Sequence, residues 1–267
     1  MTIPDPGPVP DLRVTPESEP AVVFDAVHVD LASRDRTYAT PDRVLASLSF
    51  TAPAGRITAL IGANGAGKST AIAALSGAIG VRAGRITVLG RDMSDADAPL
   101  PDAAAVVGDE PGLPTTLRIP ALLRAVAAGK PRMDAALAWQ MIDREGISIS
   151  ATLGSLSRGQ VAVLQRAIAL AADPDLLVLD EPAARLDPLG REVLADELRA
   201  FMAGRDTRSV LMATHDLDGI ERLADHLVVI ADGRCVLEED LDALAEVHGG
   251  DVTATVTRAL ADARGGR

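Results

Sequence analysis

The sequence is short of three kinds of feature, and each shortage excludes a class of protein. It has a single cysteine, Cys235, so no intrachain disulfide can form, and we expect this side chain to act as a small buried hydrophobe. Its 26 basic residues are scattered and outnumbered by 38 acidic ones, whereas a protein that coats nucleic acid needs clustered lysine and arginine. No run of about 18 apolar residues is free of charge and proline, so no membrane-spanning helix is expected. Nucleic acid is therefore not an expected partner.

The remaining pattern is that of a large α/β domain. Aromatic residues are only 2% of the chain while hydrophobic residues are 48%, so Ala, Val, Ile and Leu must build the core. From residue 21 onward, β-like segments alternate with helical ones, which favours right-handed crossovers and a mainly parallel sheet. Residues 114–172 are consecutive helical segments and are expected to form an insertion in that pattern. Residues 1–20 contain six prolines and are expected to be a disordered leader.

Residues 60–70, LIGANGAGKST, contain one of the chain's two lysines and its only asparagine. The pattern Gly62-x4-Gly67-Lys68-Ser69 follows an expected strand and precedes an expected helix, the context of a phosphate-binding loop. Glycines let backbone N–H groups close around phosphate oxygens, and the helix N-terminus adds its positive dipole end. Lys68 offers a compact charge to the β and γ phosphates, and the Ser69 hydroxyl can bind Mg²⁺. The predicted nucleotide-binding residues are Gly62, Ala63, Asn64, Gly65, Ala66, Gly67, Lys68, Ser69 and Thr70.

A second motif, LLVLDEP at 176–182, is an apolar strand that ends in two acids. Asp180 would lie beside the metal ion and hold it directly or through water. Glu181 would polarise the attacking water as a general base. Taken alone, this pattern equally fits a strand followed by a polar turn. Together with the phosphate loop it predicts hydrolysis of a nucleoside triphosphate.

The segment LSRGQ at 156–160 resembles the signature motif of ABC-type ATPases. In that family the signature serine and glycine, with a helix N-terminus behind them, press on the γ-phosphate bound by a second subunit. The resemblance implies this role for Leu156, Ser157, Arg158, Gly159 and Gln160, although Arg158 stands where the family usually has glycine. ATP and Mg²⁺ are the implied cofactors.

Further positions follow the order of the same family. ARLDP at 184–188 is similar to the D-loop, with Asp187 reaching across the dimer, and His215 resembles the switch histidine that contacts the γ-phosphate and holds water with Glu181. Tyr38 is placed to stack on adenine, although an exposed loop aromatic fits the pattern too. Asp109 aligns with a glutamine that touches Mg²⁺ and signals to the membrane partner. The implied metal ligands are Ser69, Asp180 and Asp109, and the implied catalytic residues are Glu181, His215 and Lys68.

The resemblance also implies a fold and a setting. The fold would be α/β, a P-loop NTPase core with a mainly parallel sheet, an N-terminal antiparallel β subdomain and an inserted α-helical subdomain. The ATPase domain is expected over 21–247, with its core at 21–108 and 173–247, its helical insertion at 109–172, and a C-terminal tail at 248–267. The implied protein is the ATP-hydrolysing subunit of an ABC transporter, cytoplasmic and peripheral on the inner face of the membrane. Its implied partners are a separate transmembrane permease subunit and a second copy of itself or a sibling, bound head to tail around two ATP.

Three questions stay open at this level. The segment GLPTTLRIPALLR at 112–124 looks somewhat more like exporter than importer ATPases, and nothing identifies the cargo. A soluble ABC-type ATPase acting on ribosomes or DNA would share these motifs, but such proteins tend to carry two cassettes, long insertions or basic surfaces. A weakly hydrolysing regulatory module is favoured by Asp109 and Arg158 and opposed by the intact Lys68, Asp180, Glu181 and His215.

Overall fold

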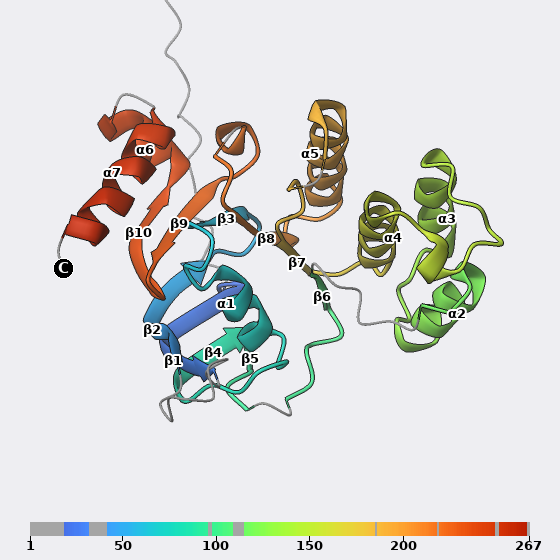
Figure 1. Ribbon diagram of the computed structural model, residues 1–267, viewed down its shortest axis with the longest axis horizontal. Coiled ribbons are helices and arrows are strands. Elements are labelled where there is room, and N and C mark those ends of the chain that lie inside the picture. The colour runs from blue at the N-terminus through green and yellow to red at the C-terminus, as the bar shows by residue number, and fades with distance from the viewer. Residues whose placement is uncertain are drawn as a thin grey trace, which may run out of the picture.

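The computed structural model describes residues 19–31, 42–95, 98–108, 115–184, 186–217, 219–248 and 251–265 (Figure 1). Its first sheet is antiparallel and has the strand order β2-β1-β4-β5. The strands are β1 (Val22–Leu31), β2 (Asp42–Ala52), β4 (Ala83–Val88) and β5 (Arg91–Asp92). Residues on one face of β1 and β2 are buried and residues on the other are more exposed, the pattern of a sheet with one covered face. This sheet confirms the expected N-terminal antiparallel subdomain.

The second sheet is mainly parallel and has the order β10-β9-β3-β8-β7-β6. Its parallel strands are β3 (Ile57–Ile61), β6 (Ala104–Val107), β7 (Leu176–Asp180), β8 (Ser209–Thr214) and β9 (His226–Ala231). β10 (Arg234–Asp240) pairs antiparallel with β9 at one edge. The central strands are buried along nearly their whole length because both faces of the sheet are covered. The predicted mainly parallel core is confirmed.

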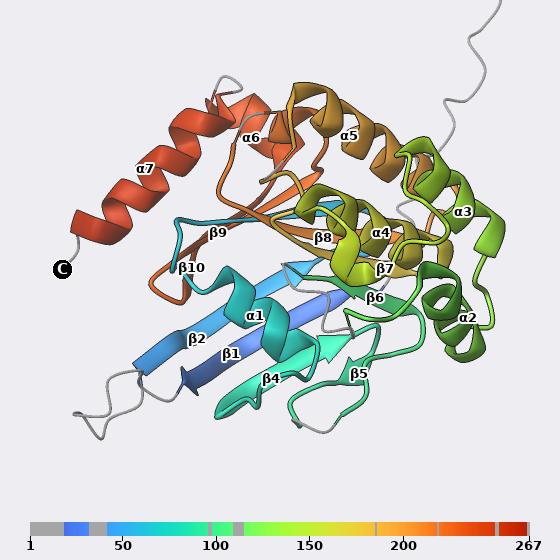
Figure 2. The ribbon, with the colours of Figure 1, turned by 45° about the vertical axis from the view of Figure 1, so that its right-hand side comes forward.

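The two faces of this sheet pack on different partners. One face packs against α1 (Lys68–Leu75) and the first sheet. The other packs against α4 (Arg158–Ala171), α5 (Pro188–Ala203) and the C-terminal helices. Figures 1 and 2 accordingly show the first sheet and α5 on opposite sides of the second sheet.

The expected helical insertion is present. It contains α2 (Ile119–Gly129), α3 (Ala135–Arg144), the short η1 (Leu153–Ser155) and α4, and it lies at the end of the molecule away from α7 in both views (Figures 1 and 2). Asp134 caps α3 by accepting from the backbone N–H groups of Ala136 and Leu137. Just after α2, Lys130 Nζ donates to the carbonyl oxygens of Asp102 (2.8 Å) and Ala104 (3.4 Å) at the start of β6, which ties the insertion to the core.

The C-terminal residues form more structure than the sequence indicated. α6 (Leu241–His248) follows β10, and α7 (Val252–Gly265) packs against β9 and β10 with Val252 and Val256 buried. The segment described above as a tail therefore includes a helix docked on the core. Among the described residues, no helix is long and apolar enough to cross a membrane. The expected leader at 1–20 lies almost entirely outside the described residues.

Candidate nucleotide site

The phosphate loop joins β3 to α1, and its backbone conformation depends on glycine. Gly65 and Gly67 have φ angles of +83° and +110°, in the left-handed region that side chains disfavour. A Cβ on Gly62 would lie 2.5 Å from the carbonyl oxygen of Ile230, so the loop can pack there only without a side chain. Gly67 is the N-cap of α1 and no described side chain caps this helix. The first N–H groups of α1 are thus left for a ligand, as an anion site requires.

Lys68, the first residue of α1, turns back across this loop. Its side chain is only 5% exposed. Nζ donates to the carbonyl oxygen of Gly62 (2.8 Å) and to that of Ala63 (3.4 Å), and lies 3.2 Å from Oε1 of Glu181. A buried ammonium group needs such partners because the interior solvates charge poorly.

Three neighbouring strands bring the predicted catalytic residues to one edge of the sheet. β3, β8 and β7 lie side by side in parallel, and Lys68, His215 and Glu181 follow their respective carboxyl ends. Oε2 of Glu181 is 2.8 Å from Nδ1 of His215 and 3.4 Å from its backbone N. Glu181 therefore bridges Lys68 and His215 through its two carboxylate oxygens, so the three residues predicted to be catalytic lie together, and their catalytic roles stay predictions.

The backbone of Glu181 is itself unusual. Its φ is +49°, a left-handed conformation in a residue other than glycine, while its N–H donates to the carbonyl oxygen of Ala213 on β8 (2.9 Å). Such conformations are found at functional sites, where the surrounding structure holds them. Here the conformation turns the chain off β7 and points the carboxylate at Lys68 and His215.

A cleft of about 800 Å³ opens at this edge. The phosphate loop, the acidic end of β7 and the start of α4 all line it, through Asn64, Ser69, Asp180, Glu181, His215, Arg158 and Gly159 among others. The oxygens of Ser69 and Asp180 form the hard donor set that suits Mg²⁺. Among the described residues no three His, Cys, Asp or Glu side chains are grouped to hold a metal. The donor set fits Mg²⁺ held by few protein groups and completed by phosphate and water oxygens, its usual manner of binding beside nucleotides.

The signature segment forms a capping box. Ser157 is the N-cap of α4, and its Oγ accepts from the N–H of Gln160 (3.2 Å) while the side chain of Gln160 accepts from the N–H of Ser157 (3.1 Å). Ser157, Arg158 and Gly159 are exposed, so this helix start is accessible from solvent. Asp187 caps α5 in a similar way by accepting from the N–H of Gly190 (2.7 Å). Contact of these residues with a second subunit stays a prediction.

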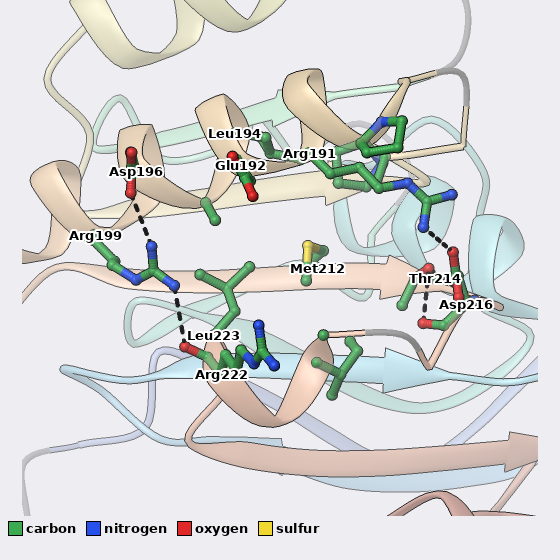
Figure 3. Close-up of a pocket in the computed structure, with 16 residues that line it drawn as sticks. Arg191, Glu192, Leu194, Asp196, Arg199, Met212, Thr214, Asp216, Arg222 and Leu223 are labelled. Atoms are coloured by element: carbon green, nitrogen blue, oxygen red, sulfur yellow. Dashed lines mark hydrogen bonds and ion pairs between the residues drawn. The ribbon is translucent and has the colours of Figure 1, made fainter.

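A smaller cavity of about 470 Å³ lies between α5, β8 and η2 (Ile220–Arg222), and Figure 3 shows its lining. Nη1 of Arg191 lies 2.7 Å from Oδ2 of Asp216, as the dashed line at one end of the view marks. Arg191 is one turn after Asp187, and Asp216 directly follows His215. The ion pair therefore joins the first turn of α5 to the loop that carries His215, a link that no sequence pattern indicates.

Gly233 is another residue that the sequence analysis missed. Its N–H donates to the carbonyl oxygen of Ala66 in the phosphate loop (3.0 Å), and its own carbonyl oxygen accepts from the N–H of Ala46 on β2 (2.9 Å). It thus connects the phosphate loop to the first sheet. The sequence did contain a signal, since an Asp-Gly pair between two β-like segments is typical of a tight hairpin turn.

Two predicted positions, Tyr38 and Asp109, lie outside the described residues. Their proposed contacts with adenine and Mg²⁺ stay predictions. Arg185, within the D-loop segment, also lies outside them.

Comparison with known proteins adds a family to this geometry. Residues 45–184 match the sequence profile of the ABC transporter family. Nod factor export ATP-binding protein I of Rhizobium sp. (strain N33) is 34% identical over 232 residues, covering 84% of this chain and 74% of the relative. Its namesake from Burkholderia lata is 35% identical over 215 residues, covering 76% and 68%.

Solved structures agree in fold. A structure titled as the ATP-binding subunit of an ABC transporter has a TM-score of 0.74 at 25% identity, covering 90% of this chain and 99% of that one. An ATP-binding cassette in its ADP conformation has a TM-score of 0.67 at 19% identity, covering 91% and 98%. The motifs, the fold and the relatives together show that this chain belongs to the ABC transporter family, in which it is an ATP-binding subunit.

Proposed function

We propose that the protein hydrolyses ATP in a head-to-tail dimer and so drives a substrate through a separate membrane subunit. The observation that carries the proposal is the position of Glu181, whose carboxylate lies within 3.2 Å of Lys68 Nζ and 2.8 Å of His215 Nδ1 at the mouth of the cleft. A general base, a histidine to hold the attacking water and a lysine for the phosphates are thus assembled beyond the carboxyl ends of adjacent strands. A module that only binds ATP has no need for this grouping.

Each residue has a distinct task in this reaction. The loop N–H groups and Lys68 bind and orient the triphosphate, and Ser69 and Asp180 would hold Mg²⁺, which supplies charge neutralisation between the phosphates. When Lys68 Nζ donates to the phosphates, it moves away from Oε1 of Glu181, because its hydrogen bonds are then directed at phosphate oxygens. Glu181 is then available to accept a proton from the attacking water, while His215 keeps Oε2 oriented.

Two features support a dimer as the working form. The signature residues at the start of α4 are exposed. Leu189, two residues after Asp187, is also exposed, at 69%. Dimerisation and ATP hydrolysis are general properties of the family to which the chain belongs. We therefore propose that Ser157 and Gly159 complete the site of a second chain.

The coupling to transport is proposed from the relatives. Those described above are named as ATP-binding proteins of Nod factor export, so we propose export as the direction and place the protein at the inner face of the membrane. The partner would be a transmembrane permease subunit that receives motion through the helical insertion. The names of relatives do not extend to the cargo of this chain.

The test uses purified full-length protein and its Glu181→Gln variant. With ATP and Mg²⁺ we expect the wild type to release phosphate at a rate per chain that rises with protein concentration. Removing the general base should lower turnover about 10²–10⁴-fold. The variant should also elute from a sizing column as a dimer with ATP and as a monomer with ADP.

The matched control is Glu192→Gln, an exposed carboxylate on α5, which should behave as the wild type. A Glu181→Gln protein that stays monomeric at saturating ATP and Mg²⁺ would count against the dimer. Full wild-type turnover at dilutions where only monomers exist would refute the shared site.

A further inference from the structure

We propose that Arg166 and Glu197 are a positioning pair that fixes the direction of the signature helix α4 against α5. The inference rests on the proposed function, because it concerns how the signature of one chain is aimed at the nucleotide of another. Nε of Arg166 lies 2.6 Å from Oε2 of Glu197, and their side chains are only 5% and 15% exposed. The pair joins the helical insertion to the core.

The place of the pair sets it apart from an ordinary ion pair. Arg166 lines the 800 Å³ cleft that holds the phosphate loop. Glu197 lines a different cavity, of about 610 Å³, between α3, α4 and α5. The pair therefore stands in the wall between two hollows, beside apolar residues of α4 and α5 that belong to the same core cluster.

The other polar links described between the insertion and the core lie outside α4 or are long. Lys130 and Arg132 contact the core outside α4, and the Arg132–Asp175 pair is 42% and 29% exposed. Gln165 on α4 donates to the carbonyl oxygen of Gly108 at 3.4 Å, a long hydrogen bond. Asp173, just after α4, pairs with Arg205 and Arg208, but among the described residues the Arg166–Glu197 pair is the buried, charge-assisted link within α4 itself.

Burying the charges of Arg166 and Glu197 costs free energy, and a role in fixing direction would account for that cost. Burying an ion pair carries a desolvation penalty that the attraction often fails to repay, and apolar replacements of similar volume are frequently neutral or stabilising. An apolar pair, however, would allow the helices to slide, whereas the hydrogen-bonded pair holds one distance and one angle. The desolvation cost of the Arg166–Glu197 pair is therefore explained by its role in orienting α4 against α5.

The geometry converts a small tilt into a large displacement at the signature. Ser157 lies nine residues before Arg166, or about 13 Å along the helix at 1.5 Å per residue. A tilt of about 5° about the pair would move Ser157 by about 1 Å, and a misplacement of this size can cost about 100-fold in rate. α5 matches this arrangement, since Asp187 caps it ten residues before Glu197. Both helix starts that face the partner are thus fixed from one point.

The experiment compares wild type with the double variant Arg166→Met, Glu197→Met. Methionine fills similar space without charge, so the folded protein should keep a melting temperature within about 5 °C of the wild type. ATP affinity measured on dilute, monomeric protein should be unchanged, because the phosphate loop is not touched. Turnover at saturating ATP should fall about 10- to 100-fold. In a Glu181→Gln background, the protein concentration at which ATP produces dimers should rise at least about tenfold.

The control is Arg199→Met, which removes an exposed ion pair with Asp196 on the same helix and should change none of these quantities. If the double variant does not fold, Arg166→Lys carries the test, because it keeps the charge but loses the planar guanidinium. Lower turnover with unchanged ATP affinity would support the proposal in either variant.

A folded variant with wild-type turnover and dimerisation would overturn the positioning role while leaving the proposed function intact. A wild type that neither turns over nor dimerises would instead refute the proposed function itself.

Discussion

Gly233 offers a sharp test of how the nucleotide site is held, because it touches no ligand in the proposed mechanism. It lies in the turn between β9 and β10 with φ at +70°, and it hydrogen-bonds both the phosphate loop and β2. We expect Gly233→Ala to weaken ATP binding by displacing the loop from behind.

The magnitude follows from the space around the residue. A Cβ at Gly233 would lie 2.1 Å from the carbonyl oxygen of Val44, more than about 1 Å inside an ordinary contact, so the backbone of the turn or of β2 must move. The left-handed conformation costs alanine about 1–2 kcal/mol. Movement would also break the bonds to Ala66 and Ala46, worth about 0.5–1.5 kcal/mol each. The expected loss of stability is about 2–5 kcal/mol.

Gly146 provides the matched control. It too has a positive φ, +62°, but a Cβ there would meet nothing within 4 Å, and it lies beyond α3 in the helical insertion. Gly146→Ala should therefore cost only the conformational part, about 1–2 kcal/mol. The two variants then differ by the lost hydrogen bonds, about 1–3 kcal/mol, so at about 2–4 °C per kcal/mol Gly233→Ala should melt about 2–12 °C below this control.

The assay measures thermal unfolding and nucleotide affinity of both variants. We expect the control to bind ATP as the wild type does, and Gly233→Ala to bind at least about tenfold more weakly, since the loop loses its support at Ala66. Equal melting temperatures and equal affinities for the two variants would refute the reasoning. They would show that the turn yields without moving the loop.

Two further predictions concern titratable groups outside the site. Burial, together with the nearby charge of Glu238, raises the pKa of Cys235 to about 11. Iodoacetamide at about pH 8 should therefore label Cys235 about 100-fold more slowly in the folded protein than in the urea-unfolded protein. Similar labelling rates in the two states would contradict this. Burial alone would lower the pKa of His226, but hydrogen bonds and charge from Glu238 and Asp240 outweigh burial and raise this pKa above 6.5. Burial alone would raise the pKa of Asp240, but contacts with His226 and Arg56 outweigh it and lower this pKa below 3.8. The contribution of His226 to stability is then complete below pH 6.5 and is lost as pH rises through its raised pKa. The contribution of Asp240 is complete above pH 3.8 and is lost as pH falls through its lowered pKa. The melting-temperature difference between wild type and His226→Gln should be largest between these values and shrink at higher pH; a difference that is flat from about pH 6 to about pH 9 would contradict it.

The sequence was most informative where function depends on consecutive residues. The phosphate loop, the acidic end of β7 and the capping box of α4 each act through a short segment, so their patterns are visible without the fold. The parallel order of β3, β8 and β7 then brings those segments together at one sheet edge. The distances from Glu181 to Lys68 and His215 show that meeting, while the catalytic roles of the three residues stay predictions.

The sequence was least informative where support comes from distant segments. Arg166 and Glu197 are 31 residues apart, and nothing in either helix indicates which charged residue faces the other. The role of Gly233 depends on residues 46 and 66, brought to the turn by two different sheets. α7 also went unassigned, because a short, mildly amphipathic segment can only be placed once the surface that covers it is known.

The two lysines of the sequence share one hydrogen-bonding geometry in the structure. Both lysines, Lys68 and Lys130, donate from one nitrogen to two backbone carbonyl oxygens, and at Lys68 this nitrogen is buried. A compact ammonium group can direct its three donors at partners converging on a point, whereas the planar fork of arginine spreads its five donors outward. At Lys130 the partners are neutral and the contact only fastens the insertion. At Lys68 the third partner is the carboxylate of Glu181. If Nζ leaves this carboxylate for a phosphate, the positive charge beside the proposed general base is withdrawn. Arg at position 68 could keep the charge but could not make that exchange from the same small space.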